Sequence, residues 1–139
     1  MKANTFFPLA TIALLAAGLA QQAFSAADSE QTYEGMRYVC AGVSQESRDD
    51  SRWSSYPVKL VFAAADGGFL GDVKVKIGDA KGDTVLQAHC LSPWLLVDLG
   101  PGSYKVEAMA RQDYQQSFAL QVADGQQQEH TTRFPEIAN

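Results

Sequence analysis

Apolar and polar residues alternate along most of this chain with a period of two. The pattern is clearest between Phe69 and Ala110, where valine, isoleucine and tyrosine positions alternate with lysine, aspartate and glutamate. Such alternation is typical of β-strands with one buried face, because successive side chains of a strand point to opposite sides. After residue 27, no window of ten residues shows the 3.6-residue apolar period of a helix. The pattern therefore predicts an all-β protein.

Eight segments are predicted as strands, separated by turns rich in Gly, Pro, Asp and Ser. They are Met36–Val43, Tyr56–Ala63, Phe69–Ile77, Thr84–Cys90, Trp94–Leu99, Ser103–Ala110, Gln115–Val122 and a last edge strand, Gln127–Phe134. The fifth of these is apolar throughout, as expected for a strand that is buried on both faces. Seven or eight short strands at intervals of roughly ten residues indicate an antiparallel Greek-key sandwich.

Residues 1–27 have the order of a secretory signal peptide. Lys2 supplies the positive charge, Phe6–Ala20 is the apolar body, and Ser25 and Ala27 suit the small-residue subsites of a signal peptidase. Cleavage is expected after Ala27 or, alternatively, after Ser25. An uncleaved helix that tethers the protein to the membrane is the other interpretation, although the apolar body is short for a stable anchor.

The remaining chain is expected to form one domain. We expect a flexible N-terminal segment at 28–35, a single β-sandwich domain at 36–134 and a C-terminal tail at 135–139, with no membrane span after cleavage. Loss of Lys2 with the leader takes the formal net charge from −5 to −6. An acidic exported chain lacks the basic surface that nucleic acids need. The sequence thus predicts a monomer in the periplasm or outside the cell.

The chain contains two cysteines, Cys40 and Cys90. An even number of cysteines in an exported protein favours a disulfide bond. The alternatives are a redox pair or two metal ligands. Neither cysteine lies in a C-x-x-C motif, which argues against redox catalysis.

Two strings carry a resemblance to a known family. They are G-D-V-K-V-K-I-G-D-A-K-G-D, from Gly71, and P-W-L-L-V-D-L-G-P-G-S-Y-K-V-E-A, from Pro93. Over Tyr56–Val122 the chain resembles the carboxypeptidase regulatory-like domains, which have a transthyretin-like (prealbumin-like), immunoglobulin-like sandwich. The matching positions are Asp79, Gly82, Leu99, Pro101, Gly102, Tyr104 and Val106. The resemblance implies a small exported bacterial protein with an accessory or recognition role and no catalysis.

The polar segment Ser44–Ser55 lies outside that resemblance and is predicted to be a long loop. Trp53 is its one large apolar residue, close to Arg48 and Arg52. An exposed tryptophan flanked by arginines is typical of protein interfaces and sugar-binding rims. The alternative is that Trp53 holds the loop down on the domain. Trp94 is expected to pack at a sandwich end, and these two tryptophans and two arginines are the candidate binding surface.

Catalytic chemistry finds little support in the residues present. The histidines are His89 and His130, and no serine lies in a G-x-S-x-G context, so a hydrolase is the weakest hypothesis. A metal site built from these histidines, Cys90 and Met36 is disfavoured, because neighbouring residues on a strand face opposite sides.

A calcium site at Asp49–Asp50 or Asp66 is also disfavoured, because the regular acidic spacing of calcium loops is missing. We expect no catalytic residues, metal or cofactor. The sequence favours a non-catalytic exported binding or structural module that recognises another envelope protein or a carbohydrate. The alternative function is a periplasmic inhibitor or immunity protein that acts against a hydrolase.

Overall fold

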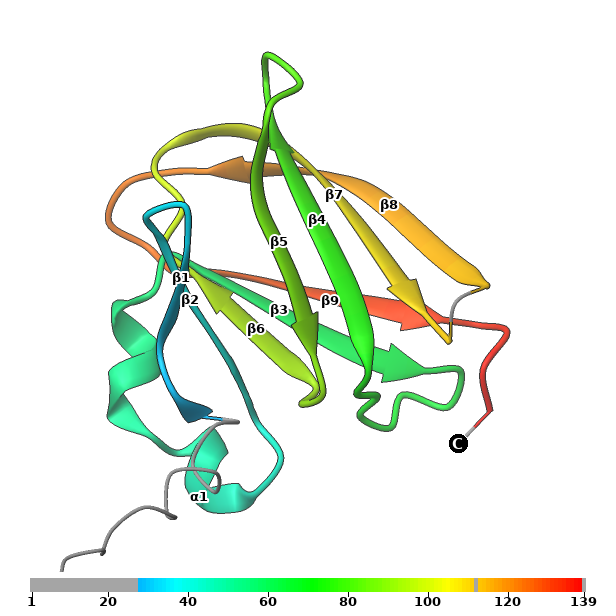
Figure 1. Cartoon of the computed structure of the whole chain (residues 1–139). Coiled ribbons are helices and arrows are strands. Elements are labelled where there is room, and N and C mark those ends of the chain that lie inside the picture. The colour runs from blue at the N-terminus through cyan, green and yellow to red at the C-terminus, as the bar shows by residue number, and fades with distance from the viewer. Residues whose placement is uncertain (1–27, 112, 139) are drawn as a thin grey trace, which may run out of the picture.

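The computed structural model describes residues 28–111 and 113–138, so the predicted signal peptide lies outside the described residues. In these ranges nine strands form two sheets that pack face to face (Figure 1). Sheet A contains, in order across the sheet, β1 (Gln31–Tyr33), β2 (Met36–Ala41), β6 (Trp94–Val97), β3 (Val58–Ala64) and β9 (Gln128–Phe134). Sheet B contains β5 (Thr84–Cys90), β4 (Val73–Asp79), β7 (Gly102–Ala110) and β8 (Tyr114–Val122). The predicted all-β sandwich is confirmed.

Strand pairing is antiparallel at every junction but one in the described chain. The exception is β9, which runs parallel to β3 from Val58 opposite Gln128 to Ala64 opposite Phe134. β8 ends in sheet B, and the connection after it crosses to sheet A and starts β9 (Figure 1). The sequence predicts β9 as an edge strand but gives no sign that its neighbour would be parallel.

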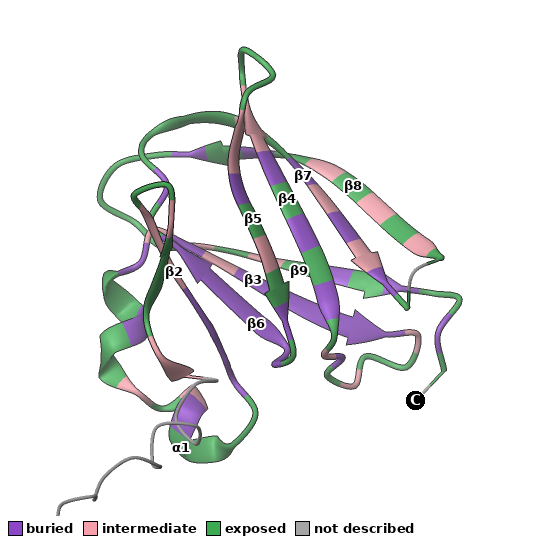
Figure 2. Ribbon diagram, in the orientation of Figure 1, coloured by how far each residue is buried: buried purple, intermediate pink, exposed green. Residues whose placement is uncertain are grey.

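The alternation in the sequence becomes a core between the sheets (Figure 2). In β4, Val73, Val75 and Ile77 are buried, and the lysines between them are exposed. All four residues of β6 are buried, as predicted for a strand covered on both faces. Both faces of sheet A are therefore covered by protein at β6, the outer face as well as the inner one.

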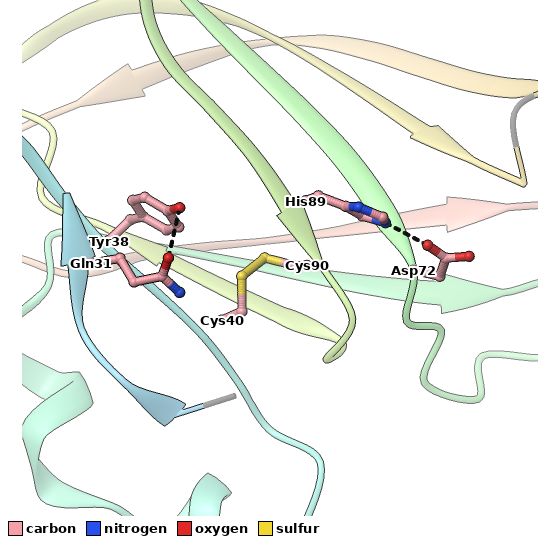
Figure 3. The surroundings of a disulfide bond; sticks show 6 residues. All are labelled: Gln31, Tyr38, Cys40, Asp72, His89 and Cys90. Atoms are coloured by element: carbon pink, nitrogen blue, oxygen red, sulfur yellow. Dashed lines mark hydrogen bonds and ion pairs between the residues drawn. A yellow bond between two sulfur atoms is a disulfide. The ribbon is translucent and has the colours of Figure 1, made fainter. Parts of the chain in front are cut away.

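A disulfide joins Cys40 of β2 to Cys90 of β5, with a Cα–Cα distance of 5.4 Å (Figure 3). Both cysteines are buried. The predicted pairing is confirmed, and it links one sheet to the other. It closes a loop with a sequence separation of 50 residues, which limits the freedom of the unfolded chain.

The N-terminal segment differs from expectation. Within 28–35, where the sequence predicts no strand, Gln31–Tyr33 forms β1 and pairs with β2. The two-residue turn between them has positive φ at both positions, 48° at Glu34 and 87° at Gly35. Turns of this kind match the twist of a β-hairpin, and the glycine adopts the conformation without strain. The pairing with β2, rather than apolar patterning, makes this segment a strand.

Two further boundaries differ from the sequence prediction. Ile137, assigned to the tail outside the domain, is buried in the core, and its backbone carbonyl accepts a hydrogen bond from the Ala65 N–H at 2.8 Å. The strand expected to start at Phe69 begins at Val73 instead. Asp72 has a φ of 62°, a left-handed conformation that interrupts extended structure just before β4.

The segment Ser44–Ser55 is not an irregular loop, contrary to the prediction. It forms a short helix, α1 (Gln45–Arg48), and a 3₁₀ helix, η2 (Ser51–Ser55). The Ser44 hydroxyl accepts a hydrogen bond from the Ser47 N–H at 3.0 Å, and the Asp50 carboxylate accepts one from the Arg52 N–H at 2.9 Å. These are N-caps, which satisfy amides that have no partner inside a helix.

Candidate binding rim at one end of the sandwich

A second apolar cluster lies on the outer side of sheet A, beneath α1 and η2. Its members are Val39, Ala41, Trp53, Tyr56, Val61, Trp94 and Leu96. Trp53 is 4 % exposed, and its indole Nε1 donates a hydrogen bond to the Ser47 carbonyl at 2.7 Å. Of the two interpretations of Trp53, the structure supports the one in which it holds the segment down on the domain.

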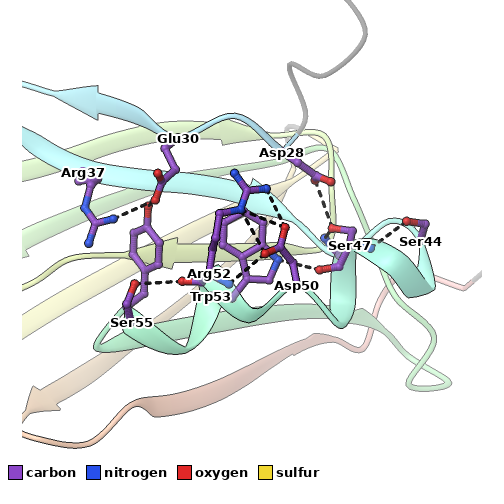
Figure 4. Close-up of polar contacts among 11 residues, drawn as sticks. Asp28, Glu30, Arg37, Ser44, Ser47, Asp50, Arg52, Trp53 and Ser55 are labelled. Atoms are coloured by element: carbon purple, nitrogen blue, oxygen red, sulfur yellow. Dashed lines mark hydrogen bonds and ion pairs between the residues drawn. The ribbon is translucent and has the colours of Figure 1, made fainter.

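The arginine beside Trp53 covers its outer side. Arg52 lies over the indole ring at 4.6 Å and binds the Asp50 carboxylate, with Nη2 2.7 Å from Oδ2 (Figure 4). Its guanidinium holds the pKa of Asp50 below the usual range. Arg52 therefore stays on the surface, but the tryptophan below it is closed to a partner.

The N-terminal segment contacts the same cluster through a polar group. The Tyr56 hydroxyl donates a hydrogen bond to the Glu30 carboxylate, and Arg37 Nη1 lies 2.8 Å from the same carboxylate oxygen (Figure 4). The tyrosine hydrogen bond, aided by the charge of Arg37, lowers the pKa of Glu30. Burial, together with this hydrogen bond, raises the pKa of the Tyr56 phenol well above its usual value. Tyr56 thus remains a neutral donor.

Trp94 is also buried and does not form an open binding surface. It is 7 % exposed, and the Lys59 ammonium lies 3.5 Å from its ring centroid. Gly42 lies so close to the indole that an added Cβ would be 2.7 Å from its Cγ and Cδ2 atoms. The sequence prediction that Trp94 packs as a core residue agrees with this burial, although it packs outside the main core.

The large apolar side chains that are exposed in the described chain lie in three connections of the fold. They are Val43, after β2, at 64 % exposed; Phe69, between β3 and β4, at 49 %; and Leu91, between β5 and β6, at 72 %. These connections share one end of the sandwich, the lower edge in Figure 1. We call Val43, Arg48, Phe69 and Leu91 the rim.

Arg48 joins the parts of the rim. Its Nη1 donates to the Gly42 carbonyl at 2.8 Å, and its guanidinium carbon lies 5.2 Å from the Phe69 ring centroid. It is half-buried. Of the four candidate binding residues from the sequence, Arg48 is the one that the structure places among exposed apolar side chains.

Close packing fixes the connections that carry the rim. A Cβ at Gly71 would overlap the Leu91 carbonyl, so the β3–β4 and β5–β6 connections approach as closely as only glycine allows. The Leu70 N–H donates to the Phe62 carbonyl at 2.9 Å and fastens the same connection to β3. The rim is therefore held in place before any partner binds, which lowers the entropy cost of binding.

An acid–base pair lies at the same end of sheet B. His89 Nε2 is 2.5 Å from Asp72 Oδ1, and both side chains are largely exposed (Figure 3). Triad chemistry also needs a hydroxyl nucleophile next to the histidine. In the described ranges, Asp72 is the one side chain bonded to His89.

The other groups that the sequence offers as metal ligands, Cys90 and His130 among them, are engaged in separate contacts. Cys90 is bonded to Cys40 and offers no thiolate to a metal. His130 stacks on Phe118 at a centroid distance of 3.8 Å, and burial lowers its pKa. Among the residues that the structure describes, no three His, Cys, Asp or Glu side chains gather as metal ligands.

The outer face of sheet B is uncovered and slightly hollowed. The hollow has a volume of about 490 Å³ and is lined by residues of the four strands β4, β5, β7 and β8. Its lining includes the long polar side chains of Lys74, Lys76, Gln87 and Glu107, together with Met109. This face is charged and shallow, and it lacks the exposed apolar side chains that distinguish the rim.

Sequence reasoning did not single out Val43, Phe69 or Leu91. Val43 and Phe69 stand at the ends of predicted strands, each directly after a glycine, and Leu91 lies between two predicted strands. An apolar side chain in a glycine turn is a weak signal, because only the fold shows whether the turn tucks it inward. The three connections also lie far apart in the chain.

Compared with known proteins, the chain matches no protein-family model and no curated protein sequence. Many families share an all-β sandwich, so the fold alone does not identify a carboxypeptidase regulatory-like domain. In the part of the chain described here, no helix has the length and apolar character needed to cross a membrane.

Proposed function

We propose that the protein is an exported, non-catalytic binding module that recognises another protein of the cell envelope through the rim. One observation carries the proposal: the exposed large apolar side chains of the described chain lie in three connections at one end, where Arg48 contacts both Phe69 and the Val43 carbonyl. Clustered apolar exposure is typical of interaction sites, whereas scattered single residues are ordinary. Arginine and aromatic residues are enriched at the centres of such interfaces.

A protein partner suits the rim better than a carbohydrate. Sugar recognition commonly uses the flat faces of exposed aromatic rings; both tryptophans are buried in this structure, and the Arg48 guanidinium lies over the ring of Phe69. Val43 and Leu91 offer aliphatic surface, and Arg48 adds a positive charge beside Phe69. These properties fit an apolar segment that carries a carboxylate next to its apolar residues.

Export is part of the same proposal. The leader at 1–27 has the order of a signal peptide, and a disulfide such as Cys40–Cys90 persists mainly in oxidising compartments. The resemblance to carboxypeptidase regulatory-like domains agrees with an accessory role. Cell fractionation with N-terminal sequencing tests this step. We expect a mature chain in the periplasm or medium that begins after Ser25 or Ala27, and an uncleaved cytoplasmic chain would contradict it.

The rim is tested by paired variants. Envelope partners are cross-linked to the wild-type protein and identified, and the affinity of each purified partner is then measured by calorimetry. We expect the double variant Phe69→Ser/Leu91→Ser to bind at least roughly tenfold more weakly, because hot-spot residues dominate binding energies. Lys74→Ser/Lys76→Ser on the open face of sheet B is the matched control and should bind normally.

The opposite result would contradict the proposal. If the two lysine substitutions weakened binding and the two rim substitutions did not, the partner would bind the open face of sheet B. Both double variants change exposed side chains, so both should fold. Unfolding curves in urea check this point independently of the partner.

A further inference from the structure

The sequence predicts a monomer, but the structure leads us to a different proposal. We propose that the edge of β8 pairs with β8 of a second copy of this chain, so that two copies of sheet B join in one continuous sheet. An edge strand presents backbone N–H and C=O groups that a further strand can bind. β8 forms one border of sheet B in Figure 1. This surface is separate from the rim, and the inference does not depend on the proposed function.

The long β8 edge is regular and open. Its nine residues pair with β7 without a bulge, from Gly102 opposite Val122 to Ala110 opposite Tyr114. Among the described residues, the backbone of β8 makes no hydrogen bond to any strand other than β7. One side of the strand therefore keeps unpaired backbone groups along its whole length.

The sequence of β8 lacks the features that keep edge strands apart. The segment Y-Q-Q-S-F-A-L-Q-V contains no charged residue, no proline and no glycine. Natural edge strands usually carry charges, prolines or bulges, or are very short, because these features block further pairing.

The other three edges of the sandwich each have such a feature. β1 has only three residues. β5 has a register shift opposite Ile77 and Gly78 and is bound through Cys90 to sheet A. β9 carries the exposed charges Glu129 and Arg133. Only β8 is left without one among the described strands.

A second copy is the occupant that the chemistry of β8 favours. Without Lys2 the exported chain carries a formal net charge of −6, so a contact between two copies is favoured where it brings no like charges together. β8 is the nine-residue edge strand that adds no charged side chain to such a contact. A twofold axis at Phe118 would set Ser117 opposite Ala119 and Gln115 opposite Gln121, so that carboxamides face each other.

Half-buried aromatic groups add to this argument. Tyr114 and Phe118 lie on the inner side of β8 and pack on the core without being fully covered. A second strand along the edge would cover more of both rings. This adds apolar burial to the backbone hydrogen bonds that the new ladder would form.

Analytical ultracentrifugation of the purified exported protein tests the pairing, with a charge-swap pair as the probe. We expect a concentration-dependent dimer for the wild type. In Ser117→Lys/Ala119→Lys, lysines oppose lysines across the axis, and the dimer should dissociate roughly tenfold more readily. Mixing this variant with Ser117→Glu/Ala119→Glu should restore a dimer that contains one copy of each.

The control places lysines on the other two longer edges, in Gln87→Lys/Thr131→Lys, and should leave the dimer unchanged. Positions 117 and 119 are exposed, and urea unfolding of each variant reports whether it folds. A wild type that stays monomeric at every concentration would overturn the proposal. So would a dimer that survives in the lysine variant, or one that the control disrupts.

Discussion

The outer faces of the two sheets differ in what covers them. Sheet A is covered by α1 and η2, and a second apolar cluster, which includes Trp53 and Trp94, fills the space beneath. Sheet B is bare, and alternate residues of β4 and β5 are exposed polar side chains. The inner faces of both sheets pack regularly into the main core, so the difference between the sheets lies outside that core.

The difference between the outer faces separates structural residues from surface that is free to bind. The tryptophans, which look like binding residues in the sequence, serve to close sheet A. The rim and the border strand β8 lie outside that cover. Tryptophans, which are common in binding sites, are thus structural in this protein. The candidate contacts at the rim include aliphatic and aromatic side chains in the connections between strands.

The largest expected effect tests the cover on sheet A. Trp53→Ala should lower the free energy of unfolding by about 3–5 kcal/mol, because it removes a buried ring and leaves a cavity under η2. Lys76→Ala, on the bare face of sheet B, should change it by no more than about 0.5 kcal/mol. Urea unfolding measures both. Equal effects would mean that the two faces do not differ as described.

The second largest loss of stability is expected on removal of the disulfide, because this bond connects the two sheets. The double variant Cys40→Ala/Cys90→Ala is expected to lose about 2–4 kcal/mol, chiefly through the greater freedom of the unfolded chain. Guanidinium unfolding of this variant, compared with the oxidised wild type, gives the value. A variant as stable as the wild type would show that the bond adds nothing to the joining of the sheets.

Gly71→Ala tests whether packing fixes the rim. The new methyl group would overlap the Leu91 carbonyl, so the two connections must move apart at a cost of about 1–3 kcal/mol. Gly100→Ala is the control, because an added Cβ at Gly100 meets open space and the residue does not have a positive φ. Gly82 also has open space but is unsuitable, because its φ is positive. Thermal unfolding of Gly71→Ala and Gly100→Ala should therefore differ clearly. Equal midpoints would contradict close packing at the rim.

The smallest expected effect concerns pH. Burial lowers the pKa of His130 in the folded protein, so the unfolded chain binds a proton more readily. Stability from the neutral ring is present above the unfolded value of about 6.5 and is lost as the pH falls from there toward the folded value. Urea midpoints should drop over this range, and the drop should be smaller in His130→Phe. An equal drop in both proteins would assign it to other groups.

Much of the fold follows from local patterns. β5 has the predicted bounds, Thr84–Cys90, and β4 shows the predicted alternation of buried valines with exposed lysines. These strands can be predicted from the sequence because one face of each is buried, which imposes an apolar period of two. The disulfide can be predicted as well, since two cysteines allow one pairing.

Other features depend on contacts that the sequence does not display. β1 is polar and forms a strand because the Glu34–Gly35 turn folds it onto β2. The helices α1 and η2 bury only Ser47 and Trp53, too few residues for an apolar period, so their capping residues were the only local sign. The rim gathers residues from three connections, and only the completed sandwich brings them together.

Acrylamide quenching of tryptophan fluorescence tests the cover on sheet A most directly. The native protein has two tryptophans, and Trp94→Phe leaves Trp53 as the sole emitter. With the cover closed, Trp53 should emit at short wavelength and be quenched weakly until urea unfolds the protein. Quenching of native Trp53 as strong as that of the unfolded chain would contradict a closed cover and restore Trp53 as a candidate contact.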